Sequence, residues 1–314
     1  MNRLRTAVIG VGYLGKFHAE KYAALGRADL VAVADSNATT AANIAQQLDC
    51  RAVTDYRDLL GQVDAVSVVV PTQLHHRVTK DFLERGTHVL VEKPITATAE
   101  QAQELIDIAT AQNLVLQVGH LERFNPSILA LEGVLSQPQF IESHRVAPFN
   151  PRGADVNVIL DLMIHDIDII LDIVAAPVQR IDANGVAVLS KDVDIANARI
   201  AFTNGCVANV TASRAGLKRE RKMRLFQHDA YITIDFQNKK LGIHRKGKGE
   251  MYPGIAEIDS EERVFDQGDA LKSEIESFLD CIVNAKPPVV SGMDGKRALE
   301  TAIEITRLLH HPDH

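Results

Sequence analysis

The chain has 314 residues, of which 46% are hydrophobic and 24% are charged, a composition typical of a globular protein with two domains. Its 34 basic and 41 acidic residues give a net charge of -7, which argues against nucleic-acid and membrane-surface binding. The three cysteines, Cys50, Cys206 and Cys281, lie too far apart for a metal-binding pair or a disulfide framework. Because the sequence also shows neither a signal peptide nor a membrane-spanning run, we expect a cytoplasmic protein.

Strand-like and helix-like segments alternate over the first 120 residues. Short apolar runs predict buried strands at Arg5–Ile9, Leu30–Ala34, Ala65–Val70, His88–Val91 and Val115–Val118. Apolar residues spaced three and four apart predict helices at Leu14–Leu25, Ala38–Leu48, Leu74–Arg85 and Ala99–Gln112. This alternation indicates an α/β domain, in which a parallel sheet carries helices on both faces.

The pattern changes near residue 120. A helix-like stretch at Pro126–Leu135, a strand-like Phe140–Ala147 and a long helix at Val156–Val174 come first. From Arg180 to Phe265, polar and apolar residues then alternate, as is typical of antiparallel strands joined by hairpin turns. Two further helices are predicted at Ala270–Asn284 and Asp294–His310. The second part is therefore expected to be an α+β domain built on an open sheet.

A glycine-rich turn joins the first strand to the first helix. It reads Gly10-Val11-Gly12-Tyr13-Leu14-Gly15 and matches the GxGxxG pattern of dinucleotide-binding turns. In that pattern Gly10 permits the tight turn, Gly12 lets the backbone approach a pyrophosphate, and Gly15 allows helix and strand to pack closely. The N–H groups of the helix N-terminus can then bind phosphate. The alternative is a glycine turn that binds no ligand.

Asp35 closes the second strand, twenty residues after Gly15. Its carboxylate can accept hydrogen bonds from the adenosine ribose hydroxyls and repels a 2′-phosphate. Ser36 and Asn37, which follow it, provide no arginine for such a phosphate. We therefore expect NAD as the cofactor in preference to NADP.

Two further segments carry a family resemblance: Val70-Pro71-Thr72-Gln73-Leu74-His75-His76 and Val91-Glu92-Lys93-Pro94. With the glycine turn, they resemble the glucose–fructose oxidoreductase, inositol dehydrogenase and rhizopine-catabolism (Gfo/Idh/MocA) family. The resemblance implies an α/β Rossmann domain over residues 1–120. It also implies an α+β domain with a large open, mostly antiparallel sheet over residues 121–314, for substrate binding and oligomerisation. The C-terminal helix is expected to pack back on the first domain. Members oxidise or reduce sugars and polyols with NAD(P).

The resemblance also implies roles for particular residues. Pro71, Thr72 and His75 would lie along the cofactor, and Lys93 would touch the reacting hydroxyl, with a cis bond between Lys93 and Pro94. The cofactor-binding residues expected from the turn and the resemblance are Gly10, Gly12, Tyr13, Leu14, Gly15, Asp35, Ser36, Pro71, Thr72, His75, Glu92 and Lys93. A loop histidine such as His75 can instead have a purely structural role.

The second catalytic segment that the resemblance implies is Asp161-x-x-x-His165 on the long helix. Residues four apart share a helix face, so Asp161, His165 and the nearby Asp168 are expected to line one cleft. Lys93 and His165 are both candidates for the base that takes the hydroxyl proton, and the sequence does not choose between them. Many members carry a glycine pair or triplet before the aspartate, whereas this chain has Gly153-Ala154. That departure weakens an inference of polyol specificity.

The segment from Gly119 to Pro126 narrows the substrate. It resembles the branch of the family that acts on UDP-linked N-acetyl sugars, in particular UDP-N-acetylglucosamine 3-dehydrogenases of lipid A biosynthesis, whose keto product an aminotransferase consumes. The resemblance implies hydride transfer from the sugar 3-hydroxyl carbon to NAD. Arg123, Asn125 and Arg152 are candidates for the diphosphate or the sugar substituents, because arginine binds two oxygens at once. The expected substrate-binding residues are Lys93, Arg123, Phe124, Asn125, Arg152, Asp161 and His165.

Other interpretations stay open at this point. The chain could be a free sugar or inositol dehydrogenase of the same family, or an NAD-binding regulator without catalysis. Asp161 and His165 could be a zinc pair, although no third ligand other than Asp168 is evident nearby, and His165 could be a core histidine. The open sheet would expose an apolar face in a monomer, so we expect a homodimer or homotetramer.

Overall fold

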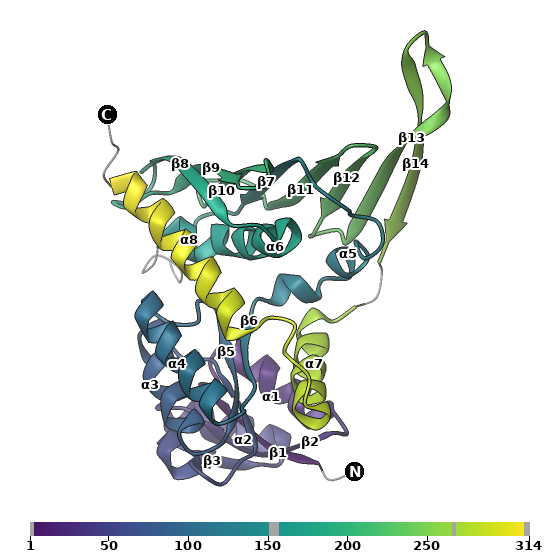
Figure 1. The fold of residues 1–314 in the computed structure, drawn as a ribbon. Helices are drawn as coiled ribbons and strands as arrows, with labels where there is room; N and C mark the ends of the chain where they lie inside the picture. Colours follow the sequence, from purple (N-terminus) through teal and green to yellow (C-terminus); the bar gives the residue numbers. More distant parts are fainter. Residues whose placement is uncertain (1–2, 151–156, 266–267, 311–314) are drawn as a thin grey trace. The chain divides into compact units, whose positions relative to one another are not determined.

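The structure is a computed structural model that describes residues 3–150, 157–265 and 268–310 (Figure 1). The chain divides into two compact units. Unit 1 consists of Met1–Leu121 and Asp269–Leu299, and unit 2 of Glu122–Gly268 and Glu300–His314. Each unit is built around its own sheet.

Unit 1 contains a six-stranded parallel sheet. Its strands are β1 (Leu4–Ile9), β2 (Ala28–Ala34), β3 (Arg51–Val53), β4 (Ala65–Val68), β5 (His88–Glu92) and β6 (Leu116–Gly119). They lie in the order β3-β2-β1-β4-β5-β6, and each neighbouring pair is parallel. This is the Rossmann order, so the predicted fold class is confirmed. The strand order reverses between β1 and β4, and sheets of this kind bind ligands beyond the carboxyl ends of the strands at that point.

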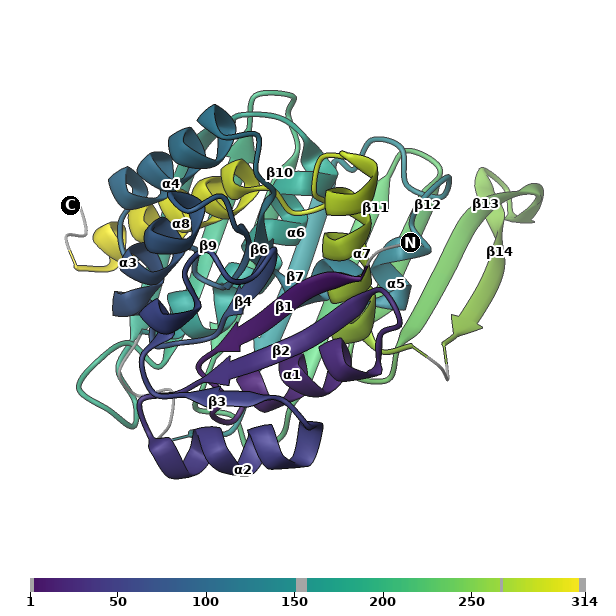
Figure 2. The same cartoon turned by 90° about the horizontal axis from the view of Figure 1, so that it is seen from below.

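Helices cover both faces of this sheet. They are α1 (Gly15–Ala24), α2 (Ala38–Leu48), α3 (Thr72–Leu83), α4 (Ala99–Ala111), α7 (Ala270–Asn284) and the first part of α8 (Gly292–His310). Figure 2 shows α7 beside α1, where Ile275 and Phe278 share a buried cluster with Tyr22. No helix in the described ranges is long and apolar enough to cross a membrane.

Unit 2 contains an eight-stranded sheet. Its strands are β7 (Phe140–Val146), β8 (Val178–Val186), β9 (Ile195–Phe202), β10 (Val207–Ser213), β11 (Glu220–Gln227), β12 (Ala230–Asp235), β13 (Lys240–Tyr252) and β14 (Ile255–Val264). They lie in the order β14-β13-β12-β11-β7-β10-β9-β8, and among the described strands of this sheet only β7 and β10 pair in parallel. One face packs against α6 (Ile164–Val174), whose isoleucines are fully buried (Figure 1).

Two predicted helices differ from those observed. The stretch predicted as helix over Pro126–Leu135 forms only a short helix, α5 (Pro126–Leu129), because the chain turns at Gly133 with a positive φ of 72°. The long predicted helix is described from Asn157 onward, and its first part, Ile159–Met163, is a π-helix that leads into α6. A π-helical turn changes the spacing of side chains on a helix, and such turns are frequent at functional sites.

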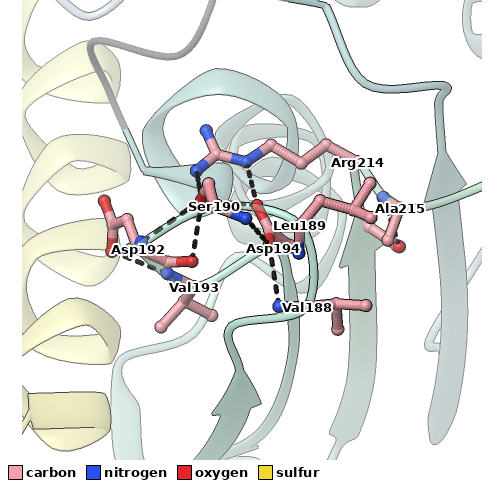
Figure 3. Close-up of polar contacts among 9 residues, drawn as sticks. Val188, Leu189, Ser190, Asp192, Val193, Asp194, Arg214 and Ala215 are labelled. Carbon is pink, nitrogen blue, oxygen red and sulfur yellow. Dashed lines mark hydrogen bonds and ion pairs between the residues drawn. The ribbon is translucent and has the colours of Figure 1, made fainter.

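A buried carboxylate organises the loop between β8 and β9. Asp194 is fully buried and accepts hydrogen bonds from the backbone N–H groups of Val188, Leu189 and Ser190. Arg214, at the end of β10, donates from Nε to the same carboxylate at 2.8 Å (Figure 3). The Asp194 side chain therefore connects the backbone of this loop to Arg214, which directly follows β10.

Candidate functional site

The glycine turn of unit 1 follows β1 directly. Gly10 has a positive φ of 85°, and a Cβ there would collide with the carbonyl oxygen of Val69. A Cβ on Gly15 would collide with the carbonyl oxygen of Gly10, whereas a Cβ on Gly12 would meet no protein atom within 4 Å. The packing of the protein therefore explains two of the three glycines. Gly12 leaves bare backbone facing open space, as a bound pyrophosphate requires.

A cavity of about 540 Å³ lies beside this turn. Its walls are the carboxyl ends of the central strands and the loops that follow them. The lining residues are Ile9, Gly10, Gly12, Ala34, Asp35, Ser36, Thr54, Asp55, Tyr56, Arg57, Val69, Val70, Pro71, Leu74, Arg77 and Val78. Tyr56, Arg57 and Arg77 were not predicted. The loop after β3 brings in Tyr56 and Arg57, but a strand of three residues leaves almost no periodic signal.

Asp35 lies at the end of β2 and braces the glycine turn. Its Oδ2 atom accepts a hydrogen bond from the backbone N–H of Val11 at 3.0 Å, and Oδ1 accepts one from Asn37 at 2.9 Å. A carboxylate has about four acceptor positions, so capacity remains for ribose hydroxyls. The bare backbone of Gly12, the cavity and this carboxylate together fit NAD.

Some of the other residues predicted for the cofactor line this cavity, and others follow lining residues in the sequence. Tyr13 and Leu14, on the glycine turn itself, are 67% and 53% exposed. Ser36 and Pro71 line the cavity, and Thr72 begins α3. The cofactor contacts of these residues stay predictions.

His75 is 2% exposed and connects α3 to two loops of unit 1. Its Nδ1 atom lies 2.8 Å from the carbonyl oxygen of Pro94, and its Nε2 atom lies 2.8 Å from that of Val70. Burial lowers the pKa of the imidazole, although both carbonyls oppose that shift. Both ring nitrogens are thus occupied by backbone, and the cofactor contact predicted for His75 stays a prediction.

Lys93 follows the last residue of β5 and is half-buried. The bond between Lys93 and Pro94 is cis, as the resemblance implies. The preceding Glu92 accepts a hydrogen bond from the backbone N–H of Lys93 at 3.3 Å and contacts His18 at 3.0 Å. The backbone N–H of Lys93 is therefore held by the half-buried carboxylate of Glu92.

Asp161 and His165 belong to unit 2, on the helix that packs under its sheet. Both are half-buried. Asn157 begins this segment and accepts a hydrogen bond from the backbone N–H of Leu160 at 3.0 Å. Asp168, which was expected to line the same cleft, is only 2% exposed and forms an ion pair with Arg123 at 3.5 Å.

The residues predicted for the substrate after β6 are buried in unit 2. Arg123 also pairs with Asp172 at 2.6 Å. Asn125 caps α5 by accepting the N–H of Ser127. Phe124, which lies between Arg123 and Asn125 in the sequence, is also buried. Each side chain therefore has a structural contact, and its contact with substrate stays a prediction. Arg152 lies outside the described residues.

Outside this cavity, the described ranges offer a second cavity but no metal-binding cluster. No group of three or more His, Cys, Asp or Glu side chains is placed there to hold a metal ion. A second cavity of about 470 Å³ lies between the end of α1 and α7, bordered by Leu25, Arg27 and Asp280. None of the predicted site residues lines it.

Two family models match the chain. The model described as "Oxidoreductase family, NAD-binding Rossmann fold" matches residues 4–120, and the model of the GFO/IDH/MocA C-terminal domain matches residues 128–233. The two matches cover the sheet of unit 1 and much of the sheet of unit 2.

Relatives with assigned activities match over nearly the whole chain. UDP-N-acetylglucosamine 3-dehydrogenase from Acidithiobacillus ferrooxidans is 42% identical over 306 residues, which is 97% of each chain. A solved structure of that enzyme, GnnA, has a TM-score of 0.93 and covers 98% of both chains. The scyllo-inositol 2-dehydrogenase (NAD(+)) of Bacillus subtilis is 25% identical, covering 97% of this chain and 94% of that protein. The fold is also shared with an NAD(H)-bound scyllo-inositol dehydrogenase from Lactobacillus casei, at 20% identity and a TM-score of 0.82 over 99% and 98% of the two chains.

Proposed function

The chain belongs to the Gfo/Idh/MocA oxidoreductase family, and on that premise we propose that it oxidises the 3-hydroxyl of UDP-N-acetylglucosamine to a ketone with NAD. One observation carries the choice of substrate. The relative that performs this reaction is 42% identical over 97% of both chains, whereas the inositol dehydrogenase of Bacillus subtilis reaches 25% over a similar span. The bare backbone at Gly12 and the carboxylate of Asp35 support NAD binding.

The catalytic residues in this proposal are Lys93, His165 and Asp161. NAD, when bound, supplies the hydride acceptor. Lys93 and His165 both contact the sugar hydroxyl, and one takes its proton while the other orients it. Asp161, the third proposed residue, precedes His165 by four residues and lies in the π-helical turn that leads into α6. The proton leaves as the C3 carbon becomes a carbonyl, so the base must be unprotonated at the start of each turnover.

The diphosphate of the substrate needs cationic partners. Arg123 and Arg152 are the proposed residues, together with the amide of Asn125 and the ring of Phe124. Because Arg123 is held by two aspartates, we assign it to shaping the substrate side of unit 2 as well as to binding. The contribution of each residue to substrate binding is measured by the increase in KM when that residue alone is replaced by Ala.

The product defines the next reaction. A 3-keto sugar nucleotide can accept an amino group, so we propose that an aminotransferase consumes it in the cytoplasm, on the route to a diamino-sugar lipid A. The three cysteines are all free thiols, which supports a reducing compartment.

Two surfaces of unit 2 support a homodimer or homotetramer. On the sheet face opposite α6, ring contacts connect Phe140, Phe226, Tyr231 and His244 across four strands. Pairing between β12 and β13 ends at Arg245, so the hairpin of β13 and β14 extends beyond the sheet with Met251, Tyr252 and Ile255 exposed (Figure 1). Light scattering should give a mass of two or four chains, and a monomer at micromolar concentration would refute this part.

The activity test is the absorbance of reduced nicotinamide. The protein is mixed with NAD and UDP-N-acetylglucosamine, and an aminotransferase with glutamate removes the ketone. We expect sustained NADH formation with the nucleotide sugar and none with free N-acetylglucosamine. Equal rates with inositol or a free sugar would favour the polyol dehydrogenase alternative. NAD binding by calorimetry without turnover of any nucleotide sugar or free sugar would favour a regulator.

A further inference from the structure

Within unit 1, the buried side chains of Tyr22, Ser67 and His18 form a hydrogen-bonded series that ends at Glu92, the residue before Lys93. His18, on α1, is 2% exposed, and its Nε2 atom lies 3.0 Å from Oε1 of Glu92. Its Nδ1 atom lies 3.2 Å from Oγ of Ser67, and that oxygen lies 2.9 Å from the hydroxyl of Tyr22. The proposed NAD and substrate contacts use neither His18, Ser67 nor Tyr22.

The hydrogen bonds of this series all have the same direction, with donors on the Tyr22 side and acceptors on the Glu92 side. An ionised carboxylate can only accept, so His18 donates from Nε2 to Glu92. A neutral imidazole then has Nδ1 free to accept from the Ser67 hydroxyl, and Ser67 in turn accepts from Tyr22. Tyr22, Ser67 and His18 therefore each donate one hydrogen bond, and the series ends at the carboxylate of Glu92, the residue before Lys93.

Two hydrogen bonds and the close packing of Gly119 hold the carboxylate of Glu92 in place. Oε1 is held by His18, and Oε2 accepts the backbone N–H of Lys93. Gly119, at the end of β6, packs so closely that a Cβ there would lie 3.0 Å from the carboxylate atoms. Burial alone would raise the pKa of Glu92, but the hydrogen bond from His18, together with the positive charge of Lys93, outweighs it and lowers the pKa. Glu92 is therefore ionised next to Lys93.

A fully buried acid, Glu274, provides a comparison for Glu92. Glu274, on α7, is 0% exposed, and neither of its carboxyl oxygens has a hydrogen-bond partner in the described structure. Burial, together with the charge of Glu92, raises the pKa of Glu274 well above its ordinary value. Glu274 is thus a neutral acid and Glu92 an anion. Glu92, unlike Glu274, has the donor that His18 supplies, and it also has the backbone N–H and the charge of Lys93.

We propose that His18 is a positioning residue for Lys93: by holding the Glu92 carboxylate, it fixes the backbone at Lys93 and keeps one negative charge beside that lysine. The proposal rests on the role of Lys93 in the proposed function. It assigns His18 no contact with substrate or cofactor. The titratable groups that act on Glu92 are His18, Lys93 and His75, and Glu92 in turn acts on Glu274.

Replacing His18 tests this proposal with two amides of different length. In His18→Gln the amide nitrogen reaches the place of Nε2 and can donate to Glu92. In His18→Asn it reaches only the place of Nδ1. His18→Leu removes both contacts at similar volume. His76→Leu is the matched control, because His76 also pairs with a glutamate, Glu104, at the surface of the same unit.

We expect kcat to fall at least about tenfold in His18→Leu and His18→Asn, and to return to within about threefold of the parent in His18→Gln. The KM for the nucleotide sugar and the Kd for NAD should change less than about threefold, because His18 touches neither. The control should keep the parent kcat. If His18→Leu does not fold, the Asn and Gln variants decide. Equal kcat values in those two would overturn the proposal.

Lys93 itself gives a readout that needs no substrate. Its rate of acetylation at fixed pH is measured by peptide mass spectrometry, with the exposed Lys248 as internal reference. Without the His18 donor, Glu92 holds its proton more tightly and Lys93 loses an anionic neighbour, so the rate should rise at least about threefold in His18→Leu. An unchanged rate in a folded variant would refute the link from His18 to Lys93. If the parent enzyme did not turn over UDP-N-acetylglucosamine, the proposed function would fail while this labelling test still stood.

Discussion

Arg145 and Asp166 form a two-bond ion pair in the core of unit 2, and Asp166 is the residue that directly follows His165 in the sequence. Nε of Arg145 lies 2.9 Å from Oδ2 of Asp166, and Nη2 lies 2.8 Å from Oδ1. The remaining nitrogen, Nη1, lies 2.8 Å from Glu122. Burial opposes the charge of Arg145, but the two carboxylates outweigh it and raise the pKa of the guanidinium. The pair holds α6 against β7 at the helical turn that carries His165.

Removing one partner of this pair should destabilise unit 2. Arg145→Met leaves Asp166 buried without its cation, so we expect the free energy of unfolding to fall by about 3 to 5 kcal/mol. Arg180→Met is the control, because Arg180 forms an exposed pair with Asp182 and should change stability by less than about 0.5 kcal/mol. Urea unfolding followed by circular dichroism measures both. An equal loss of unfolding free energy in Arg145→Met and Arg180→Met would show that burial does not determine how much an ion pair contributes to stability.

The carboxylate of Asp194 should make stability depend on pH. Burial would raise its pKa, but Arg214 and three backbone N–H groups outweigh it and hold the pKa well below the ordinary range. A folded-state pKa below the unfolded value stabilises the protein above about pH 4, and that contribution is lost as the pH falls further. Asp194→Asn should lower the free energy of unfolding by about 2 to 4 kcal/mol at pH 7 and flatten its dependence on pH between 5 and 3.

The control for Asp194 is Asp182→Asn, which removes an exposed carboxylate of the same unit. It should leave both the stability at pH 7 and its slope with pH close to those of the parent. If Asp194→Asn kept the full slope with pH, other carboxylates would be responsible for the acid sensitivity.

Local patterns predicted the elements of unit 1 well and the polar core poorly. The buried strands of the Rossmann sheet are short apolar runs, so five of them were predicted, and β3 was missed because it has three residues. His18 and Glu92 are 74 residues apart in the sequence, and Gln117 donates to the backbone of Glu274 across 157 residues. No window of sequence contains such a pair. The parallel pairing of β7 with β10 was missed for the same reason.

The predicted substrate residues show a second limit. Arg123 and Asn125 are polar residues in a loop after a strand, which favours a role in binding. The structure gives each one a buried partner, Asp168 for Arg123 and the N–H of Ser127 for Asn125. A sequence shows which side chains can bind a phosphate, but it does not show which of them the fold already uses.

Gly12 and Gly15 should respond differently to the same substitution. Gly12→Ala adds a Cβ that meets no protein atom, so stability should change by less than about 0.5 kcal/mol. The same methyl group would lie where the pyrophosphate approaches the backbone, so the Kd for NAD should rise at least about tenfold. Gly15→Ala would instead collide with the Gly10 carbonyl and cost at least about 2 kcal/mol of stability. Calorimetry and thermal unfolding separate the two effects. Unchanged NAD affinity in Gly12→Ala would remove the main structural support for the pyrophosphate position.

Lys93→Ala and His165→Ala should each lower kcat at least about 100-fold while NAD still binds, because general base catalysis contributes a factor of that size or more. Lys191→Ala, in an exposed loop of unit 2, is the control and should keep the parent rate. Chemical rescue then identifies the base. If Lys93 takes the proton, ethylamine should restore the Lys93→Ala rate in proportion to its free-base concentration. Imidazole should do so for His165→Ala if the histidine takes it. Near-native rates in both variants would refute the assignment of the two residues to the reaction.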